Sequence, residues 1–236
     1  RLCRLKRLPI EWVLFAEMNY RYRKKKMGVT SMKTKGMLLV VSGPSGAGKG
    51  TICDALRCHF PHMDYSVSMT TRAPREGEKD GVNYFFTDND RFEELLEKDA
   101  FLEYAKVYDH YYGTPKDYVF NRMDEGHHVM LEIDIQGAMQ IKKAYSDAVC
   151  IYVAPPSLEI LSQRLRNRRT DSDEVIRKRL DKARTELDWI DKYDYLIVND
   201  DLETAVSKAK AVITAEACRS RRNSVIIENL KKMYTL

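Results

Sequence analysis

The chain has 236 residues, which is enough for one large domain or two small ones with a buried core. Hydrophobic residues make up 44% and charged residues 32%, and no apolar run approaches the roughly 18 residues of a membrane-spanning helix, so a wholly disordered chain and a membrane-spanning one are both excluded. The net charge of +5 arises in residues 1–36, which carry 11 Lys and Arg against two Glu. The rest of the chain has 29 basic and 33 acidic residues and is therefore net acidic. We expect no stable nucleic-acid partner, because this part has no excess of positive charge.

We interpret residues 1–36 as a basic, disordered leader, which includes upstream sequence if translation starts at Met27, Met32 or Met37. Two alternatives stay open: an organelle import signal, and a nucleic-acid-binding arm built on residues 20–26. A secretory signal is disfavoured because charges interrupt the apolar positions and no small-residue cleavage site follows. We therefore expect a cytoplasmic protein, or an organellar one if the leader is a transit peptide.

The cysteines are odd in number and widely scattered, with no spacing typical of zinc ligands. They are Cys3, Cys53, Cys58, Cys150 and Cys218. This pattern is typical of free thiols in a reducing compartment.

From Met37 onward, short apolar runs alternate with amphipathic helical patterns, which is typical of repeated βα units. The predicted strands are Leu38–Ser42, 129–134, 148–153 and Tyr195–Val198. The predicted helices are 49–60, 91–98, 115–125, Ile135–Ala144, 157–168, 172–192 and 202–222, and an amphipathic tail of residues 223–236 follows. Because the strand runs are continuously apolar, they predict a parallel sheet covered on both faces.

A phosphate-binding loop lies directly after the first strand and directly before the first helix. It consists of Gly43, Pro44, Ser45, Gly46, Ala47, Gly48, Lys49, Gly50 and Thr51. Glycines let backbone amides converge on phosphate oxygens, the helix N-terminus adds its dipole, and Lys49 supplies a charge for the β- and γ-phosphates of a nucleotide. The sequence therefore predicts a P-loop.

One position departs from the general P-loop pattern. Gly50 follows the lysine where the pattern has a Ser or Thr that binds Mg²⁺, and Thr51 comes one residue later. The Gly-Lys-Gly-Thr run resembles the variant of several nucleoside monophosphate kinases. Thr51 is our candidate hydroxyl for Mg²⁺.

Arginines suited to bidentate phosphate binding follow in a loop punctuated by Pro and Gly, within the run Ser68-Met-Thr-Thr-Arg72-Ala-Pro-Arg75. Further motifs are Asn83-Tyr84-Phe85-Phe86, Phe101-Leu-Glu103-Tyr104, Tyr111-Tyr112-Gly113-Thr114 and Glu132-Ile-Asp134-Ile-Gln136-Gly137. In the order and spacing of these motifs, from Met37 to about residue 215, the chain closely resembles the guanylate kinases.

The resemblance implies an α/β fold: a P-loop parallel sheet flanked by helices, a small GMP-binding α+β insertion at about residues 68–125, and a helical lid at about residues 157–192. The whole domain would span residues 37–222. It implies an ATP:GMP phosphotransferase of purine nucleotide metabolism and GMP recycling, with ATP as co-substrate and Mg²⁺ as cofactor. It leaves open whether the chain is a monomer or a homo-oligomer, and it implies no membrane partner.

The resemblance also assigns a role to each residue that matches a family motif. The GMP-binding residues would be Ser68, Arg72, Arg75, Tyr84, Glu103, Tyr112, Gly113, Thr114 and Glu132, with Glu103 and Thr114 reading the guanine. Asp134 would orient Arg72 or a Mg²⁺-bound water. Asn199 would contact the adenine side of ATP.

The arginine-rich segment that follows matches the family's lid. Arg164, Arg168 and Arg179 match the arginines that close over the transferring phosphate, and Arg169 stands where the family has glycine. Together with Lys49, Arg72 and Asp134, these three arginines form the expected catalytic set. Transfer of a phosphoryl group depends mainly on such alignment and charge neutralisation.

Two other interpretations of the function stay open. One is a non-catalytic module resembling guanylate kinase that binds protein ligands; the intact Lys49 and lid arginines argue against it. The other is a different small P-loop kinase, such as a ribose-bisphosphate phosphokinase, which should lack the Glu103 and Thr114 pair.

Overall fold

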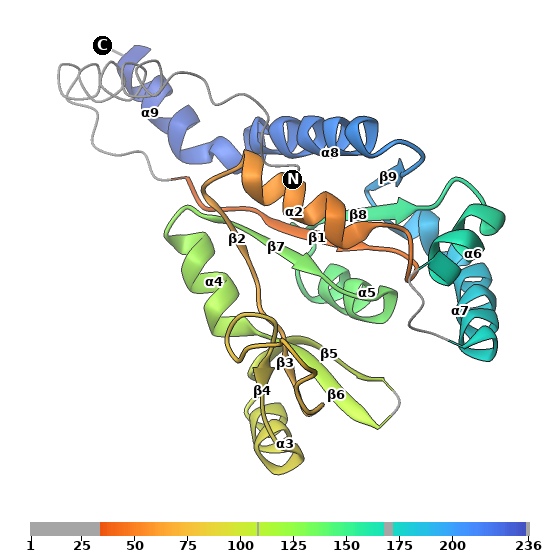
Figure 1. Ribbon diagram of the computed structural model, residues 1–236. Coiled ribbons are helices and arrows are strands. Elements are labelled where there is room, and N and C mark those ends of the chain that lie inside the picture. Colours follow the sequence, from red (N-terminus) through yellow and green to blue (C-terminus); the bar gives the residue numbers. More distant parts are fainter. Residues whose placement is uncertain (1–33, 108, 168–171, 235–236) are drawn as a thin grey trace. The chain divides into compact units, whose positions relative to one another are not determined.

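The computed structural model describes residues 34–107, 109–167 and 172–234. They form two units, one of residues 35–219 and another whose described residues are Thr34 and 220–234. The larger unit holds a parallel five-stranded sheet in the order β2-β7-β1-β8-β9 (Figure 1). Its strands are β1 (Leu38–Ser42), β2 (Met63–Tyr65), β7 (His128–Glu132), β8 (Val149–Ala154) and β9 (Tyr195–Val198).

The predicted parallel sheet is confirmed, and the strands depart from their predicted ends by at most two residues. The predicted strand 129–134 ends instead at Glu132, because the Asp134 side chain caps the next helix by accepting a hydrogen bond from the amide of Gly137 at 3.0 Å. The three-residue β2 is not among the predicted strands.

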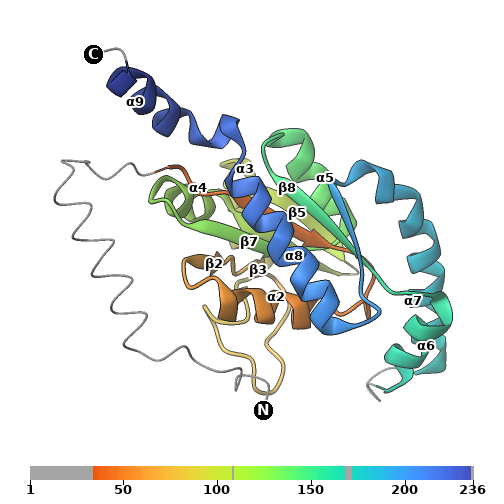
Figure 2. The ribbon, with the colours of Figure 1, turned by 90° about the horizontal axis from the view of Figure 1, so that it is seen from above.

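Helices cover both faces of this sheet, as continuous apolar strands require (Figure 2). Helices α2 (Lys49–His59) and α8 (Leu202–Ala217) pack on one face. Helices α4 (Lys116–Asp124) and α5 (Ile135–Ala144) pack on the other. Helix α8 ends five residues before the predicted end, where residues 218–222 offer no run of apolar residues to continue its buried face.

A second sheet is inserted between β2 and α4 and has the order β4-β3-β6-β5. Its strands are β3 (Met69–Thr70), β4 (Phe85–Phe86), β5 (Phe101–Val107) and β6 (His110–Pro115). Helix α3 (Asn89–Glu97) begins two residues before the predicted start, because Asp88 caps it by accepting from the amide of Arg91 at 2.8 Å. This part of the chain is the expected α+β insertion.

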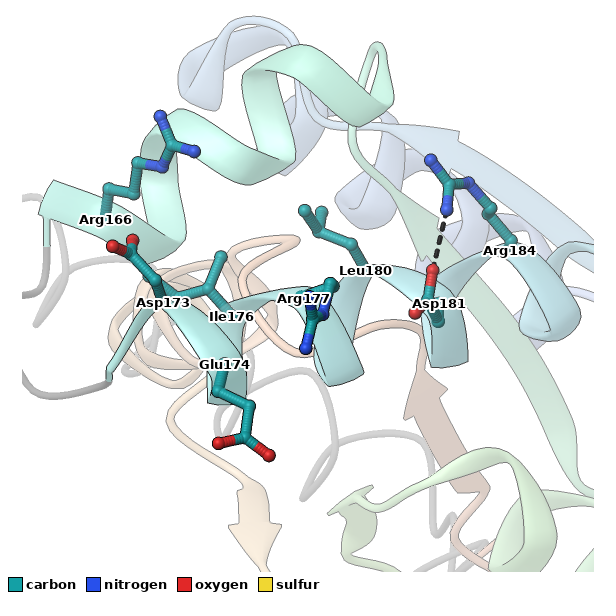
Figure 3. A pocket seen from close by; sticks show the side chains of 8 residues that line it. All are labelled: Arg166, Asp173, Glu174, Ile176, Arg177, Leu180, Asp181 and Arg184. Atoms are coloured by element: carbon teal, nitrogen blue, oxygen red, sulfur yellow. Dashed lines mark hydrogen bonds and ion pairs between the residues drawn. The ribbon is translucent and has the colours of Figure 1, made fainter.

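The expected lid contains helix α6 (Leu158–Asn167) and helix α7 (Asp173–Glu186), and α7 continues into the 3₁₀ helix η1 (Leu187–Lys192). Leu161 and Leu165 of α6 are buried against Ile176 of α7. Figure 3 shows Ile176 and Leu180 of α7 pointing towards α6. The two helices thus share a small apolar cluster of their own.

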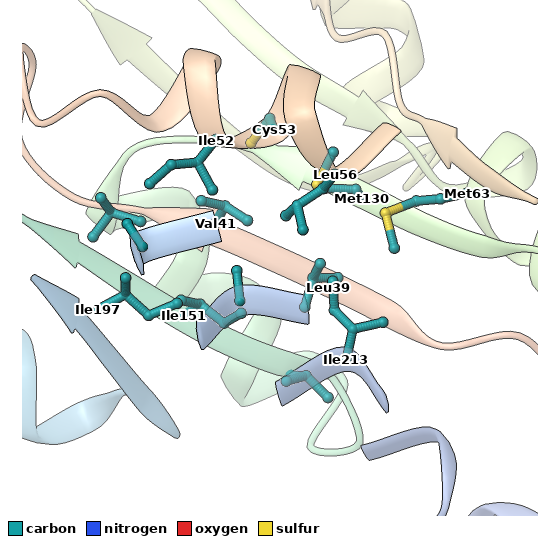
Figure 4. Packing of buried hydrophobic residues seen from close by; sticks show 14 of the residues in the cluster. Leu39, Val41, Ile52, Cys53, Leu56, Met63, Met130, Ile151, Ile197 and Ile213 are labelled. Atoms are coloured by element: carbon teal, nitrogen blue, oxygen red, sulfur yellow. The ribbon is translucent and has the colours of Figure 1, made fainter. Parts of the chain in front are cut away.

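The main core lies between β1, β8 and the helices α2 and α8 (Figure 4). Leu39 and Val41 of β1 face this cluster, whereas Leu38 and Val40 face α4 and α5, as the two-residue period of a strand requires. All four side chains are buried. The P-loop therefore starts from a strand that is immobilised on both faces.

The smaller unit contains the short 3₁₀ helix η2 (Ser220–Asn223) and helix α9 (Ser224–Tyr234), which coincides with the predicted amphipathic tail. None of the α9 residues is buried. Across the described residues, no helix combines the length and the apolar character needed to cross a membrane.

Candidate functional site

The P-loop connects β1 to α2, so its amides stand at the carboxyl end of the sheet and at a helix N-terminus. The Lys49 ammonium donates hydrogen bonds to the carbonyls of Gly43 at 2.6 Å and Pro44 at 3.1 Å, within its own loop. Gly48 has φ +93°, and a Cβ there would collide with the Asn199 amide nitrogen. Glycine is therefore required at this turn.

Residues far along the chain make hydrogen bonds to the P-loop or to Asn199, which follows β9. The buried Asn199 amide donates to the Ala47 carbonyl at 2.7 Å, and Arg164 donates to the Asn199 carbonyl at 2.9 Å. Arg179 donates to the Ser45 hydroxyl at 2.6 Å. The structure thus brings Asn199, Arg164 and Arg179 to the P-loop; Arg168, expected beside them, lies outside the described residues.

Gly50 lies next to a carboxylate. A Cβ at Gly50 would lie 3.5 Å from Oε2 of Glu132, and the same oxygen accepts a hydrogen bond from the Tyr65 hydroxyl at 3.3 Å. Burial raises the pKa of Tyr65, and Glu132 raises it further. Thr51, exposed in the first turn of α2, remains the hydroxyl nearest in sequence to Lys49.

The expected phosphate-binding residues of the insertion gather around Arg72. Its guanidinium lies 5.3 Å from the ring centre of Tyr84, and the rings of Tyr84 and Tyr112 meet edge to face at 5.9 Å. Burial raises the pKa of Tyr84. Ser68, whose carbonyl accepts a hydrogen bond from the Phe85 amide at 2.9 Å, is half-buried, whereas Arg75 is exposed.

Glu78 holds the loop that carries Arg72 and Arg75, although no motif in the sequence predicts a role for it. Both of its carboxylate oxygens lie 2.9 Å from Nη2 of Arg72, and one accepts from the Arg75 amide at 2.8 Å. The Arg75 amide and the Arg72 guanidinium keep the pKa of Glu78 below its ordinary value. Arg72 is therefore held by Glu78 and not by Asp134, whose carboxylate caps α5.

Glu103 and Thr114 face each other across β5 and β6. The Thr114 hydroxyl donates to Oε1 of Glu103 at 2.6 Å, and both residues are buried. Burial raises the pKa of Glu103 to about 7; the hydrogen bond from Thr114 opposes this shift, and the charge of Asp134 adds to it. Gly113, beside Thr114, lies against Phe92 and Phe101.

A pocket of about 710 Å³ opens between the lid helices (Figure 3). Its lining residues are Arg166, Asp173, Glu174, Ile176, Arg177, Leu180, Asp181 and Arg184. Because three arginines and three carboxylates line it, it presents no net charge to an anion, and none of the expected nucleotide-binding residues belongs to it. We therefore place it outside the candidate site.

A P-loop at the carboxyl end of a parallel sheet, with Arg179 hydrogen-bonded to it and a second loop bearing arginines in an insertion, is typical of a P-loop phosphotransferase. The family model described as guanylate kinase matches residues 35–216. The chain is 52% identical over 193 residues to the guanylate kinase of Caldanaerobacter subterraneus subsp. tengcongensis, covering 82% of this chain and 94% of that protein. It is 55% identical over 188 residues to the guanylate kinase of Carboxydothermus hydrogenoformans, covering 80% and 92%.

A solved structure agrees with these sequence matches. The crystal structure of guanylate kinase from Anaplasma phagocytophilum is similar to this chain with a TM-score of 0.66 and 32% sequence identity, covering 80% of this chain and 90% of that one. The chain belongs to the guanylate kinase family.

Proposed function

We propose that this chain transfers the γ-phosphoryl group of ATP to GMP and releases ADP and GDP. The observation that carries the proposal is the buried Glu103 carboxylate, hydrogen-bonded to Thr114 on the insertion sheet of a chain that also holds a complete P-loop. The P-loop accounts for the donor nucleotide, and the carboxylate accounts for the choice of acceptor.

The acceptor base is selected by hydrogen-bond pattern. Guanine presents two adjacent donors, the ring N1–H and the exocyclic N2–H, and one carboxylate accepts both. Adenine offers an unprotonated N1 on the same edge and no amine at C2, so AMP would leave the buried Glu103 carboxylate without the two donors that guanine supplies. That cost is the physical basis of the selectivity for GMP. The Thr114 hydroxyl holds the carboxylate in place.

The GMP phosphate is bound by the group around Arg72. Arg72 and Arg75 supply guanidinium donors, and the hydroxyls of Tyr84 and Tyr112 supply neutral ones. Ser68, Gly113 and Glu132 complete the acceptor site by their match to the family motifs. The Glu78 carboxylate orients Arg72 through its hydrogen bonds, whereas the guanine base is bound by Glu103.

Transfer is a direct in-line displacement. An oxygen of the GMP phosphate attacks the γ-phosphorus of ATP as the bond to the bridging oxygen of ADP breaks, and no covalent enzyme intermediate forms. Lys49 and the P-loop amides hold the donor phosphates, while Arg164, Arg168 and Arg179 neutralise the charge of the transferring group. Asn199, whose amide donates to the Ala47 carbonyl of the P-loop, would contact the adenine side of ATP.

The residues beside the P-loop fit Mg²⁺. This ion keeps several waters and is held by few protein oxygens together with substrate phosphates, so it needs no cluster of carboxylates; the described residues contain none. Thr51 would bind it directly and Asp134 through water, near the Glu132 carboxylate. When bound, Mg²⁺ neutralises charge on the β- and γ-phosphates.

The remaining proposals concern the ends of the chain and its location. Residues 1–36 would be a dispensable leader, residues 37–222 the catalytic domain and residues 223–236 a tail. Among the described residues, the free thiols of Cys53, Cys150 and Cys218 support a reducing compartment, for which we propose the cytoplasm.

The function is tested by coupled ADP release with ATP and a panel of acceptors: GMP, AMP, CMP, UMP and ribose bisphosphate. We expect GMP to exceed every other acceptor in kcat/KM by at least ~100-fold. Equal rates with AMP, or a preference for ribose bisphosphate, would contradict the proposal. No ADP release with any acceptor would favour the non-catalytic module.

A further inference from the structure

Helix α5 contacts both sheets of the larger unit. Ile135, Ala138 and Ile141 are buried against the parallel sheet. Gly137 and Gln140 lie three residues apart, on the side of the helix that meets β5 of the insertion sheet. The helix therefore links the insertion that carries Glu103 to the P-loop sheet.

Gln140 makes this attachment with its side-chain amide. Its Oε1 accepts from the Tyr104 amide at 3.1 Å, and its Nε2 donates to the Tyr104 carbonyl at 2.8 Å. Among the described residues, β5 is the outermost strand of the insertion sheet, so the backbone N–H and C=O groups on its outer edge have no neighbouring strand there. Gln140 binds the N–H and the C=O of Tyr104 as a residue of a neighbouring strand would.

The bound residue, Tyr104, directly follows the base-reading residue Glu103. The register of β5 against β6 shifts between Phe101 and Glu103, so that Leu102 is an extra residue in the ladder and enters the core beneath α5. The Glu103 side chain is thereby directed onto α5, where a Cβ on Gly137 would lie 2.5 Å from its Oε2. The carboxylate is held between Thr114 on one side and the backbone of α5 on the other.

We propose that Gln140 is a positioning residue for guanine selection: its two hydrogen bonds to the backbone N–H and C=O of Tyr104 hold β5 against α5 and fix the Glu103 carboxylate in the geometry that accepts both guanine donors. The proposal rests on the proposed function. Gln140 itself touches no substrate; it acts through Glu103.

The test compares wild type with Gln140→Met, which keeps the length of the side chain and removes both hydrogen bonds. Lys143→Met changes an exposed residue of the same helix and is the matched control. We expect Gln140→Met to raise the KM for GMP ~5–10-fold and to lower the ratio of kcat/KM for GMP over AMP by at least ~5-fold. The KM for ATP, the kcat at saturating GMP and the thermal midpoint of unfolding should stay close to those of the control.

A double-mutant cycle shows whether Gln140 acts through Glu103. In a Glu103→Gln background, adding Gln140→Met should change the KM for GMP by less than twofold, because the group being positioned is already altered. Full additivity, an unchanged KM for GMP in the single variant, or an equal rise in the KM for GMP and for ATP would each overturn the proposal.

Failure of this inference is distinguishable from failure of the proposed function. If wild type does not phosphorylate GMP, the proposed function is wrong and the inference falls with it. If wild type is selective for GMP and Gln140→Met behaves as Lys143→Met does, only the inference is wrong.

Discussion

Replacing Glu103 with Gln should stabilise the free protein at alkaline pH while it damages guanine selection. The substitution keeps the volume of the side chain and one acceptor for Thr114, but it removes a charge that is buried in the folded state. Burial raises the pKa of Glu103 from 4.5 to about 7, so the folded protein resists ionisation of this group while the unfolded chain does not.

The size and sign of the effect follow from linkage. A rise of that size corresponds to roughly 3 kcal/mol at about 1.4 kcal/mol for each unit of pKa. Because the folded-state pKa is the higher one, the favourable contribution is fully present below pH 4.5 and is lost as the pH rises through about 7. Relative to wild type, Glu103→Gln should therefore gain roughly 2–3 kcal/mol of unfolding free energy between pH 5 and pH 8.

Urea unfolding at pH 5, 6, 7 and 8 measures this gain, provided that the slope with urea is equal in the two proteins. The control is Glu97→Gln, which removes an exposed carboxylate at the end of α3 and should leave the pH dependence of stability as in wild type. A stability difference between Glu103→Gln and wild type that does not change with pH would refute the reasoning.

The same variant tests the functional role. Its kcat/KM for GMP should fall at least ~10-fold, the factor that corresponds to losing about 1.4 kcal/mol of transition-state binding. An unchanged ratio of GMP to AMP efficiency would remove Glu103 from base reading, whatever the stability measurement shows.

Four further outcomes are expected. GMP binding should release a proton near pH 7, because the guanine donors stabilise the ionised form of Glu103. Calorimetry in buffers of different ionisation enthalpy measures this proton, and a binding heat that is the same in every buffer would contradict the prediction. Lys49→Ala should abolish transfer with GMP affinity largely kept, and an equal loss of GMP affinity would refute that division. Thr51→Ala should raise the Mg²⁺ concentration needed for half-maximal rate at least ~10-fold, whereas Thr51→Ser should not. Deleting residues 1–31 should leave kcat and the KM for GMP within about twofold; unfolding of the truncated chain would show that the leader packs on the domain.

The parallel sheet could be predicted because its strands carry a strong, local signal. Leu38–Ser42 is buried throughout, and a continuous apolar run between turn signals is typical of such a strand. The insertion strands carry no comparable signal. β3 and β4 are two residues long, and β5 contains an extra residue at Leu102, which breaks the alternation that would identify it.

The candidate site shows the same contrast between local and distant contacts. The P-loop is contiguous, so nine residues in register predict it. Glu78, by comparison, is only six residues from Arg72 in sequence, yet its role depends on how the loop folds back. Gln140 binds the backbone of Tyr104, 36 residues away, and nothing in the pattern of an amphipathic helix marks one exposed glutamine as a partner of a distant strand.

Product analysis with γ-labelled ATP shows directly whether the γ-phosphoryl group passes to GMP. In an equimolar mixture of GMP and AMP with limiting ATP, direct transfer to a guanine-selective site predicts that almost all of the label enters GDP. Label in the diphosphate of adenosine would contradict base selection, and label in inorganic phosphate would contradict transfer to a nucleotide acceptor.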